Sequence, residues 1–120
     1  MSDYDKNNVF SKILNKEIEC EKVLEDKNNL SFNDINKQAP IHVLTIPKTR
    51  AKNLNEFSEK ASDEEISSFI KAIINVAKEK GLLESGFRVI INSGKDSHQE
   101  VPHLHAHIIG GKPLGPILSK

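Results

Sequence analysis

Cysteine and tryptophan are almost absent from this 120-residue sequence, which holds one cysteine and no tryptophan. Cys20 has no second cysteine in the chain to pair with, so an internal disulfide is excluded and a reducing, cytoplasmic setting is expected. Apolar runs reach only two to four residues, which excludes a membrane span. The polar, acidic start of the chain lacks the apolar stretch of a signal peptide.

An excess of charge is also absent, since 17 Lys and Arg residues balance 17 Asp and Glu residues. A protein that binds nucleic acid through bulk electrostatics carries a basic excess or a basic face. The balance therefore excludes that class of partner, and any nucleotide ligand has to be small and held by a specific site. The length fits one domain with a core of its own.

The spacing of hydrophobic residues predicts an α+β fold of antiparallel strands and helices. Strands are expected at residues 22–26, 29–33, 41–46, 86–92 and 101–109, helices at residues 9–16 and 63–80, and a helical turn near residues 54–57. Residues 27–29 are expected to turn because asparagine tolerates positive φ. Residues 1–8 are expected to be flexible, and residues 9–120 to form one domain with an extended C-terminal tail.

The segment 63–80 has the clearest pattern of a helix. Ser62 and Glu65 form the pair expected of a capping box, and Gly81 suits the position after the last turn. Six apolar residues follow at helical spacing and predict one buried stripe: Ile66, Phe69, Ile70, Ile73, Ile74 and Ala77. The helix is expected to be structural and to lie on the sheet.

Four of the five histidines lie between positions 98 and 107. In a strand, side chains alternate between faces, so His103, His105 and His107 are expected to line one face. Imidazole is a nucleophile that titrates near neutral pH, and a row of imidazoles can attack, orient the attacking ring and protonate a leaving group. The polar loop before the strand, with Gly94, can offer backbone N–H groups to phosphate oxygens.

A metal site is the alternative interpretation of the histidine row, because imidazole is a ligand for zinc, copper and nickel. The first and third histidines lie roughly 7 Å apart at a strand rise of about 3.3 Å per residue, which strains a tetrahedral site. No Cys, Asp or Glu follows at ligand spacing. We therefore favour a catalytic, anion-handling site and predict no metal.

The segment His103-Leu104-His105-Ala106-His107, followed by two apolar residues, matches the signature of the histidine triad family. The whole chain resembles the nucleotide-binding (Hint) branch of this family, especially its bacterial form. The resemblance extends over roughly residues 8–118, through blocks at residues 10–13, 30–35, 38–48, 92–94, 99–103 and 110–116.

The resemblance implies a five-stranded antiparallel sheet with two helices, paired into a homodimer with a continuous sheet. It implies hydrolysis of purine nucleoside 5′-phosphoramidates through a nucleotidyl-histidine intermediate, without cofactor or metal. The expected partners are purine nucleoside monophosphate derivatives and a second copy of the chain, with no nucleic acid polymer and no membrane. The alternatives are a dinucleoside polyphosphate hydrolase of the same superfamily and a non-enzymatic nucleotide-binding dimer. A nucleotidyl transferase of that superfamily is disfavoured, because that branch has Gln where this chain has His107.

By the same resemblance, His105 attacks the α-phosphorus, His107 assists the leaving group or the incoming water, and His103 and His42 support the site. Asp34 is expected to bind the ribose hydroxyls. The remaining nucleotide-binding residues implied are Phe10, Ile13, Phe32 and Ile35 around the base, and Asn92, Gln99, Glu100 and Val101 near the phosphate and leaving group.

Each of these residues also has an ordinary structural interpretation. Without the resemblance, the four apolar residues around the base would be interpreted as part of the hydrophobic core. Asp34 would be a turn or capping residue, Asn92 the end of a strand, and His42 a core histidine with its hydrogen bonds satisfied. His98 is expected to be exposed in a loop. Glu100 departs from the Ser found in some family members, and an ionised carboxylate there would repel a phosphate unless it turned away. Asn33 replaces a His that is common before the ribose Asp, and Cys20 alone cannot form the structural zinc site of some members.

Overall fold

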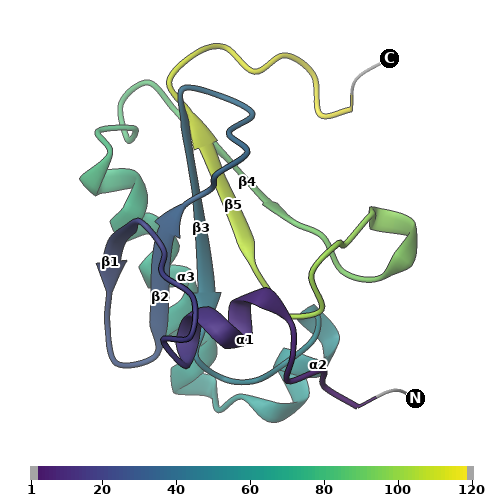
Figure 1. The fold of residues 1–120 in the computed structure, drawn as a ribbon. Helices are drawn as coiled ribbons and strands as arrows, with labels where there is room; N and C mark the ends of the chain where they lie inside the picture. Colours follow the sequence, from purple (N-terminus) through teal and green to yellow (C-terminus); the bar gives the residue numbers. More distant parts are fainter. Residues whose placement is uncertain (1–2, 119–120) are drawn as a thin grey trace.

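The computed structural model describes residues 3–118 as a twisted sheet with helices on both faces (Figure 1). The sheet is antiparallel throughout and has the strand order β1-β2-β3-β5-β4. In chain order the elements are α1 (Val9–Leu14), β1 (Lys22–Glu25), β2 (Asn29–Asn33), β3 (Ile41–Pro47), α2 (Leu54–Lys60), α3 (Asp63–Glu79), β4 (Phe87–Ile91), the short 3₁₀ helix η1 (Lys95–Ser97) and β5 (Ala106–Gly110). The predicted α+β class and five-stranded sheet are confirmed, with three α-helices where two were expected.

The alternation along the central strands separates two hydrophobic cores, one on each face of the sheet. Val43 of β3 and Ile108 of β5 point to the face covered by α3 and belong to the larger core. Leu44 and Ile46 point to the opposite face and pack with Phe10 of α1 in the smaller core. In the register of the ladder, Leu44 lies opposite His107, so His107 shares the face of the smaller core. Among residues 3–118, none of the helices has both the length and the apolarity that a membrane crossing requires.

Helix α3 begins as predicted, but its buried stripe is rotated from the predicted one. Ser62 accepts a hydrogen bond from the Glu65 backbone N–H, and the Glu65 carboxylate accepts one from the Ser62 N–H, which completes the capping box. The buried residues are Phe69, Ala72, Ile73, Val76 and Ala77, whereas Ile70 and Ile74 are 54% and 40% exposed. The prediction for Ile70 and Ile74 was wrong because small alanines let the other side of the helix approach the sheet.

The two shorter helices have different bounds from those expected. Helix α1 ends at Leu14 and not at residue 16, because Lys16 adopts a left-handed conformation with φ of 63°. Helix α2 is a full element of seven residues and not a single turn, since the Asn53 side chain caps its N-terminus by accepting from the Glu56 N–H. Asn53 could be recognised in the sequence as a cap, but no long stripe of apolar residues follows it to predict a complete helix.

Strand β5 begins at Ala106, so the predicted strand from residue 101 was too long. Pro102 has no N–H to give to a ladder, and the His103 N–H turns back to the Val101 carbonyl. The Leu104 N–H bonds to the carbonyl of Ala51, which lies beyond the end of β3. Residues 103–105 are therefore held by side-chain and loop contacts, although Leu104, like Ala106, still packs in the core beneath α3.

The turn between β1 and β2 is formed by an aspartate, and not by asparagines at positive φ. The Asp26 carboxylate accepts hydrogen bonds from the backbone N–H groups of Asn28 and Asn29, at 2.9 and 2.8 Å. Neither asparagine has a positive φ. Such an Asx turn gives the chain reversal without left-handed backbone, so the predicted location was right and its cause was wrong.

Candidate functional site

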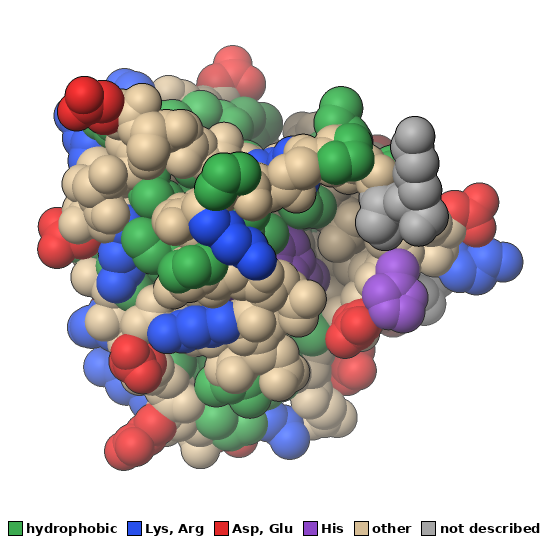
Figure 2. Space-filling model, turned by 90° about the horizontal axis from the view of Figure 1, so that it is seen from above, with side chains coloured by type: hydrophobic (Ala, Val, Ile, Leu, Met, Phe, Trp, Pro, Cys, Tyr) green, Lys and Arg blue, Asp and Glu red, His purple; other side chains and the backbone are tan. Residues whose placement is uncertain are grey.

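A cavity of about 710 Å³ opens on the α1 face of the sheet, and its wall includes three of the four clustered histidines and His42. Figure 2 shows histidine surface at the bottom of a hollow and another histidine exposed beside acidic side chains. The predicted site residues that line the cavity are His42, His105, His107, Asp34, Ile35, Phe10, Ile13, Phe32, Asn92, Glu100 and Val101. A neighbouring cavity of about 720 Å³ shares Ile13 and Cys20 with it but is lined by no histidine.

His103 is fully buried behind the cavity, and both of its ring nitrogens have partners. Its Nε2 lies 2.9 Å from the Pro47 carbonyl oxygen, which can only accept, so Nε2 carries the proton. Its Nδ1 lies 2.6 Å from the Tyr4 hydroxyl, which therefore donates to it. Burial lowers the pKa of His103 to about 4, in agreement with this neutral ring.

The orientation of His105 follows from the backbone of His103. Nδ1 of His105 lies 2.8 Å from the His103 carbonyl oxygen and donates to it, so the proton of the neutral ring is on Nδ1. The Nε2 atom keeps its lone pair and is the nitrogen left to face a ligand. Burial also lowers the pKa of His105, which keeps the ring in its nucleophilic form at neutral pH. The Phe10 ring packs edge-on against it at 4.9 Å between centroids.

His42 and His107 form a second pair, held by strands β3 and β5. The Gln38 backbone N–H donates to Nδ1 of His42 at 3.0 Å, so the His42 proton is on Nε2. That Nε2 lies 2.9 Å from Nδ1 of His107 and donates to it. The proton of the neutral His107 ring is then on its own Nε2, which makes His107 a hydrogen-bond donor in the cavity. Burial, together with the nearby His105 and His42, lowers the pKa of His107 to about 4.

Asp34 follows β2 and reaches the same pair of histidines. Its Oδ2 is 3.3 Å from Nε2 of His42, and its Oδ1 accepts from the Asn36 N–H at 2.8 Å. Ligand atoms of Asp34, His42 and His107 lie within 4.8 Å of one another, so these three residues could hold a metal ion. The sequence argument looked for metal ligands only in the triad and in the residues that follow it, and it missed Asp34 as a possible ligand because this residue follows another strand, β2. The absence of a metal stays a prediction.

An apolar wall lies beside the histidines. Phe10 and Phe32 are buried and pack edge-to-face with centroids 5.7 Å apart, and Leu44 completes the floor. These residues are core and cavity wall at once, so the two interpretations of Phe10 and Phe32 are compatible. Ile35 stands at the rim with 94% of its surface exposed, and it is the least enclosed of the predicted base contacts.

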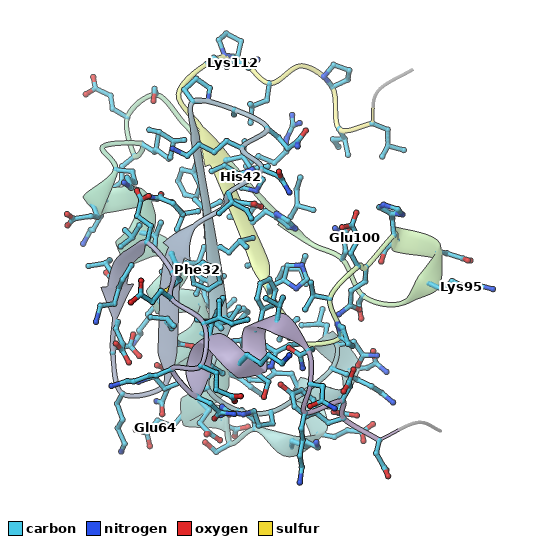
Figure 3. The ribbon with its side chains drawn as sticks, in the orientation of Figure 1. Phe32, His42, Glu64, Lys95, Glu100 and Lys112 are labelled. Carbon is cyan, nitrogen blue, oxygen red and sulfur yellow. The ribbon has the colours of Figure 1, made fainter. Side chains whose placement is uncertain are left out.

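The loop between β4 and β5 forms the opposite wall. Figure 3 shows Glu100 on this loop, with Lys95 at its outer tip. His98 is exposed, as predicted, and its Nε2 lies 2.9 Å from the Glu100 carboxylate. The Gln99 side chain does not line the cavity: it bonds to the Lys52 and Val101 carbonyls and accepts from the Gly94 N–H, so it holds the loop.

Three residues of this site were given no role in the sequence argument, although two of them lie in the block 38–48 that carries the resemblance. Leu44 lies two residues after His42 on β3, so the period-two pattern of that strand places both side chains on the same face and could have predicted Leu44. Gln38 acts through its backbone N–H, which no side-chain pattern reveals. Tyr4 lies 99 positions from His103 and within the segment expected to be flexible. The hydrogen bond to His103 gives the position of Tyr4 and does not measure its mobility, so the expected flexibility of residues 1–8 stays a prediction.

Comparison with known proteins agrees with this geometry. The sequence profile of the HIT domain matches residues 15–114. The chain belongs to the HIT family. A 13.2 kDa HIT-like protein of Azospirillum brasilense is 48% identical over 117 residues, which cover 98% of this chain and 96% of that one. The purine nucleoside phosphoramidase of Escherichia coli K12 is 37% identical over 111 residues, which cover 92% of each chain.

Solved HIT structures have the same fold. A histidine triad protein from Clostridium difficile superposes with a TM-score of 0.84 and 42% identity, covering 98% of this chain and all of that one. A HIT family hydrolase from Legionella pneumophila gives 0.82 and 36%, covering 91% and 96%. The histidine triad resemblance is therefore confirmed at the level of the family.

Proposed function

We propose that the protein hydrolyses purine nucleoside 5′-phosphoramidates through a nucleotidyl intermediate on His105. The observation that carries the proposal is the hydrogen bond from Nδ1 of His105 to the His103 carbonyl oxygen, at 2.8 Å. It orients a neutral imidazole with its Nε2 lone pair free beside a cavity of nucleotide size. The similarity to the E. coli phosphoramidase supports the same choice of substrate.

In the proposed reaction, Nε2 of His105 attacks the α-phosphorus and the P–N bond of the substrate breaks. The Nε2–H of His107 gives its proton to the leaving nitrogen, and the water of the next step returns a proton to His107. Water then displaces the imidazole, the bond between phosphorus and Nε2 breaks, and the products are a nucleoside monophosphate and an amine. The His103 carbonyl stabilises the positive charge that His105 carries in the intermediate.

The remainder of the nucleotide is assigned by chemistry. Asp34 accepts hydrogen bonds from the ribose hydroxyls, and Phe10 and Phe32, with Ile13 and Ile35 at the edge, enclose the base. The backbone at Asn92, Glu100 and Val101 lies along the phosphate side. No metal or cofactor takes part, and Cys20, without a partner, suits a reducing cytoplasm.

The direct test replaces His105 by Ala and measures turnover of an adenosine phosphoramidate with a fluorescent amine. Turnover is expected to vanish while circular dichroism and the thermal midpoint remain those of a folded protein. In acid-quenched wild-type protein, mass spectrometry should find one added nucleotidyl group that the variant lacks. Unchanged turnover in the variant would rule the mechanism out.

A matched control is Ser31→Ala, which removes a buried hydroxyl pair with Thr45 on the opposite face of the sheet. It is expected to turn over normally. Competition between the phosphoramidate and a diadenosine polyphosphate separates this proposal from a dinucleoside polyphosphate hydrolase. Tight binding of a nucleoside monophosphate with no turnover would favour a non-enzymatic role.

The homodimer expected from the resemblance belongs to the same proposal. Within residues 3–118, strand β4 pairs with β5 and lies at the edge of the sheet, and an unpaired edge is a template for a second strand. Val89 on β4 and Ile74 on α3 are about two-fifths exposed. We expect two copies to pair through β4, with a solution mass of twice the 13.4 kDa chain and a monomer for Val89→Lys. A wild-type mass of one chain at micromolar concentration would reject the dimer.

A further inference from the structure

The Tyr4 side chain, near the start of the chain, reaches the first histidine of the triad. Its hydroxyl lies 2.6 Å from Nδ1 of His103, and the two rings meet edge-on with centroids 5.6 Å apart. The Nζ atom of Lys60 in α2 lies 5.8 Å from the centre of the Tyr4 ring on another side. Figure 1 shows the N-terminal segment running beside α2. The half-buried Tyr4 therefore contacts partners from two distant parts of the chain.

The segment that carries Tyr4 is fixed to the start of α1. The Asp5 carbonyl accepts from both the backbone N–H and the side-chain amide of Asn8, at 3.2 and 2.6 Å. The Asn8 side chain in turn caps α1 by accepting from the Ser11 N–H. Phe10, two residues after the cap, packs against both His103 and His105. The same anchor thus positions Tyr4 and the aromatic wall of the site.

We propose that Tyr4 is a positioning residue, whose hydroxyl donates to the second nitrogen of the His103 ring and so holds this ring and thereby the carbonyl that orients His105. The inference rests on the proposed function of His105 as nucleophile. The His103 ring has no contact with solvent, so each of its nitrogens needs a protein partner. Pro47 accepts from one nitrogen and Tyr4 donates to the other, a pairing that only one neutral tautomer satisfies.

Loss of the hydroxyl would leave a buried acceptor without a donor. The ring then has to shift, admit water or exchange its proton, and we expect the loss of this fixed ring position to loosen the backbone of His103. The carbonyl of that residue is the acceptor for Nδ1 of His105, so the disturbance passes directly to the attacking ring. Groups that hydrogen-bond to the far side of a metal-binding histidine typically change affinity or activity by about 10- to 100-fold. Because Tyr4 acts through one further residue, we expect about a tenfold effect.

The test is Tyr4→Phe, which keeps the ring and its packing. Single-turnover kinetics with the adenosine phosphoramidate should show nucleotidylation of His105 slowed about tenfold, with the affinity for adenosine monophosphate within twofold of wild type. Nitrogen-15 NMR should find Nδ1 of His103 as a hydrogen-bonded acceptor and Nε2 protonated in wild type. In the variant, the Nδ1 signal should move and the Nδ1 signal of His105 should follow.

The control is Ser31→Ala, which also loses one buried hydroxyl hydrogen bond but on the face away from the histidines. It should leave both the rate and the histidine signals unchanged. The inference is overturned if Tyr4→Phe reacts at the wild-type rate, or if Ser31→Ala slows the reaction as much, since the effect would then be one of stability. If wild type fails to turn over phosphoramidates, the proposed function fails, whereas the NMR comparison still tests the Tyr4–His103–His105 linkage.

Discussion

The buried histidines predict that the protein loses stability on mild acidification, before its carboxylates titrate. His103 and His107 have pKa values of about 4 in the folded chain, against 6.5 for an unperturbed histidine. In both cases burial is the main cause, because a charged imidazolium is poorly solvated inside the protein. The perturbation is a change of pH from 7.5 to 5 with no change of sequence.

The sign follows from proton uptake. Between pH 6.5 and 4 the unfolded chain binds a proton at each of these histidines and the folded chain does not, so the free energy of unfolding falls as the pH falls. The stabilisation is complete above pH 6.5 and is lost as the pH drops toward 4. At pH 5, each group costs about 2 kcal/mol relative to pH 7.5, or about 4 kcal/mol for the two. Burial lowers the pKa of His42 and His105 as well, which adds to the loss.

Urea unfolding at pH 7.5, 6 and 5, at one protein concentration, measures the effect. With a slope near 2 kcal/mol per molar, the midpoint should fall by about 2 M. His107→Gln should lose about 2 kcal/mol less than wild type on acidification, whereas Ser31→Ala should be less stable by the same amount at each pH. A midpoint that stays constant or rises toward pH 5 would refute the conclusion that these rings are neutral in the folded protein.

Three further predictions concern single features. Ser62→Ala removes the cap of α3 and should lower the free energy of unfolding by about 1 kcal/mol in urea titrations, with turnover unchanged; an unchanged midpoint would contradict the role of the capping box. Asp34→Asn should abolish the preference for adenosine monophosphate over its 2′,3′-dideoxy analogue in calorimetry, and a variant that kept this preference would remove Asp34 from the ribose site. Dialysis against EDTA should leave phosphoramidate turnover unchanged; a loss that zinc restores would instead make Asp34, His42 and His107 a metal site.

Elements with strong local patterns were predictable from the sequence. The helix α3 was predicted within one residue because its cap, its acidic first turn and its apolar period agree with one another. The face shared by His105 and His107 was predictable as well, since extended backbone alternates whether or not it belongs to a ladder. The rotation of the α3 stripe was not, because apolar spacing alone does not distinguish the flanking Ile70 and Ile74 from the central Ala72 and Val76.

Contacts between distant segments account for what the sequence could not reveal. Strand β5 begins later than predicted because Pro102 has no N–H and because the Leu104 N–H donates to the Ala51 carbonyl. The second contact depends on how the chain folds beyond β3, which the sequence pattern does not show. The Pro47–His103 and Gln38–His42 hydrogen bonds decide the tautomers of their rings, yet the first joins distant segments and both use a backbone group. The Tyr4 hydroxyl that donates to the other nitrogen of His103 comes from a third segment. The triad motif thus predicts which histidines lie together, whereas the partners that determine the ring protons of His103 and His107 come from outside the motif.

The charge of the cavity also bears on the choice between the two hydrolase proposals. Its described lining includes the acidic Glu19, Glu21, Asp34 and Glu100 and no Lys or Arg. Burial lowers the pKa of His42, His105 and His107, which keeps these three rings neutral at pH 7, so a phosphate beside them is stabilised by N–H dipoles and not by imidazolium charge. Dipoles of this kind suit the single negative charge of a nucleoside phosphoramidate. Each further phosphate of a dinucleoside polyphosphate would add a negative charge near Glu100 with no cation in the described lining to offset it, which favours the phosphoramidate as substrate.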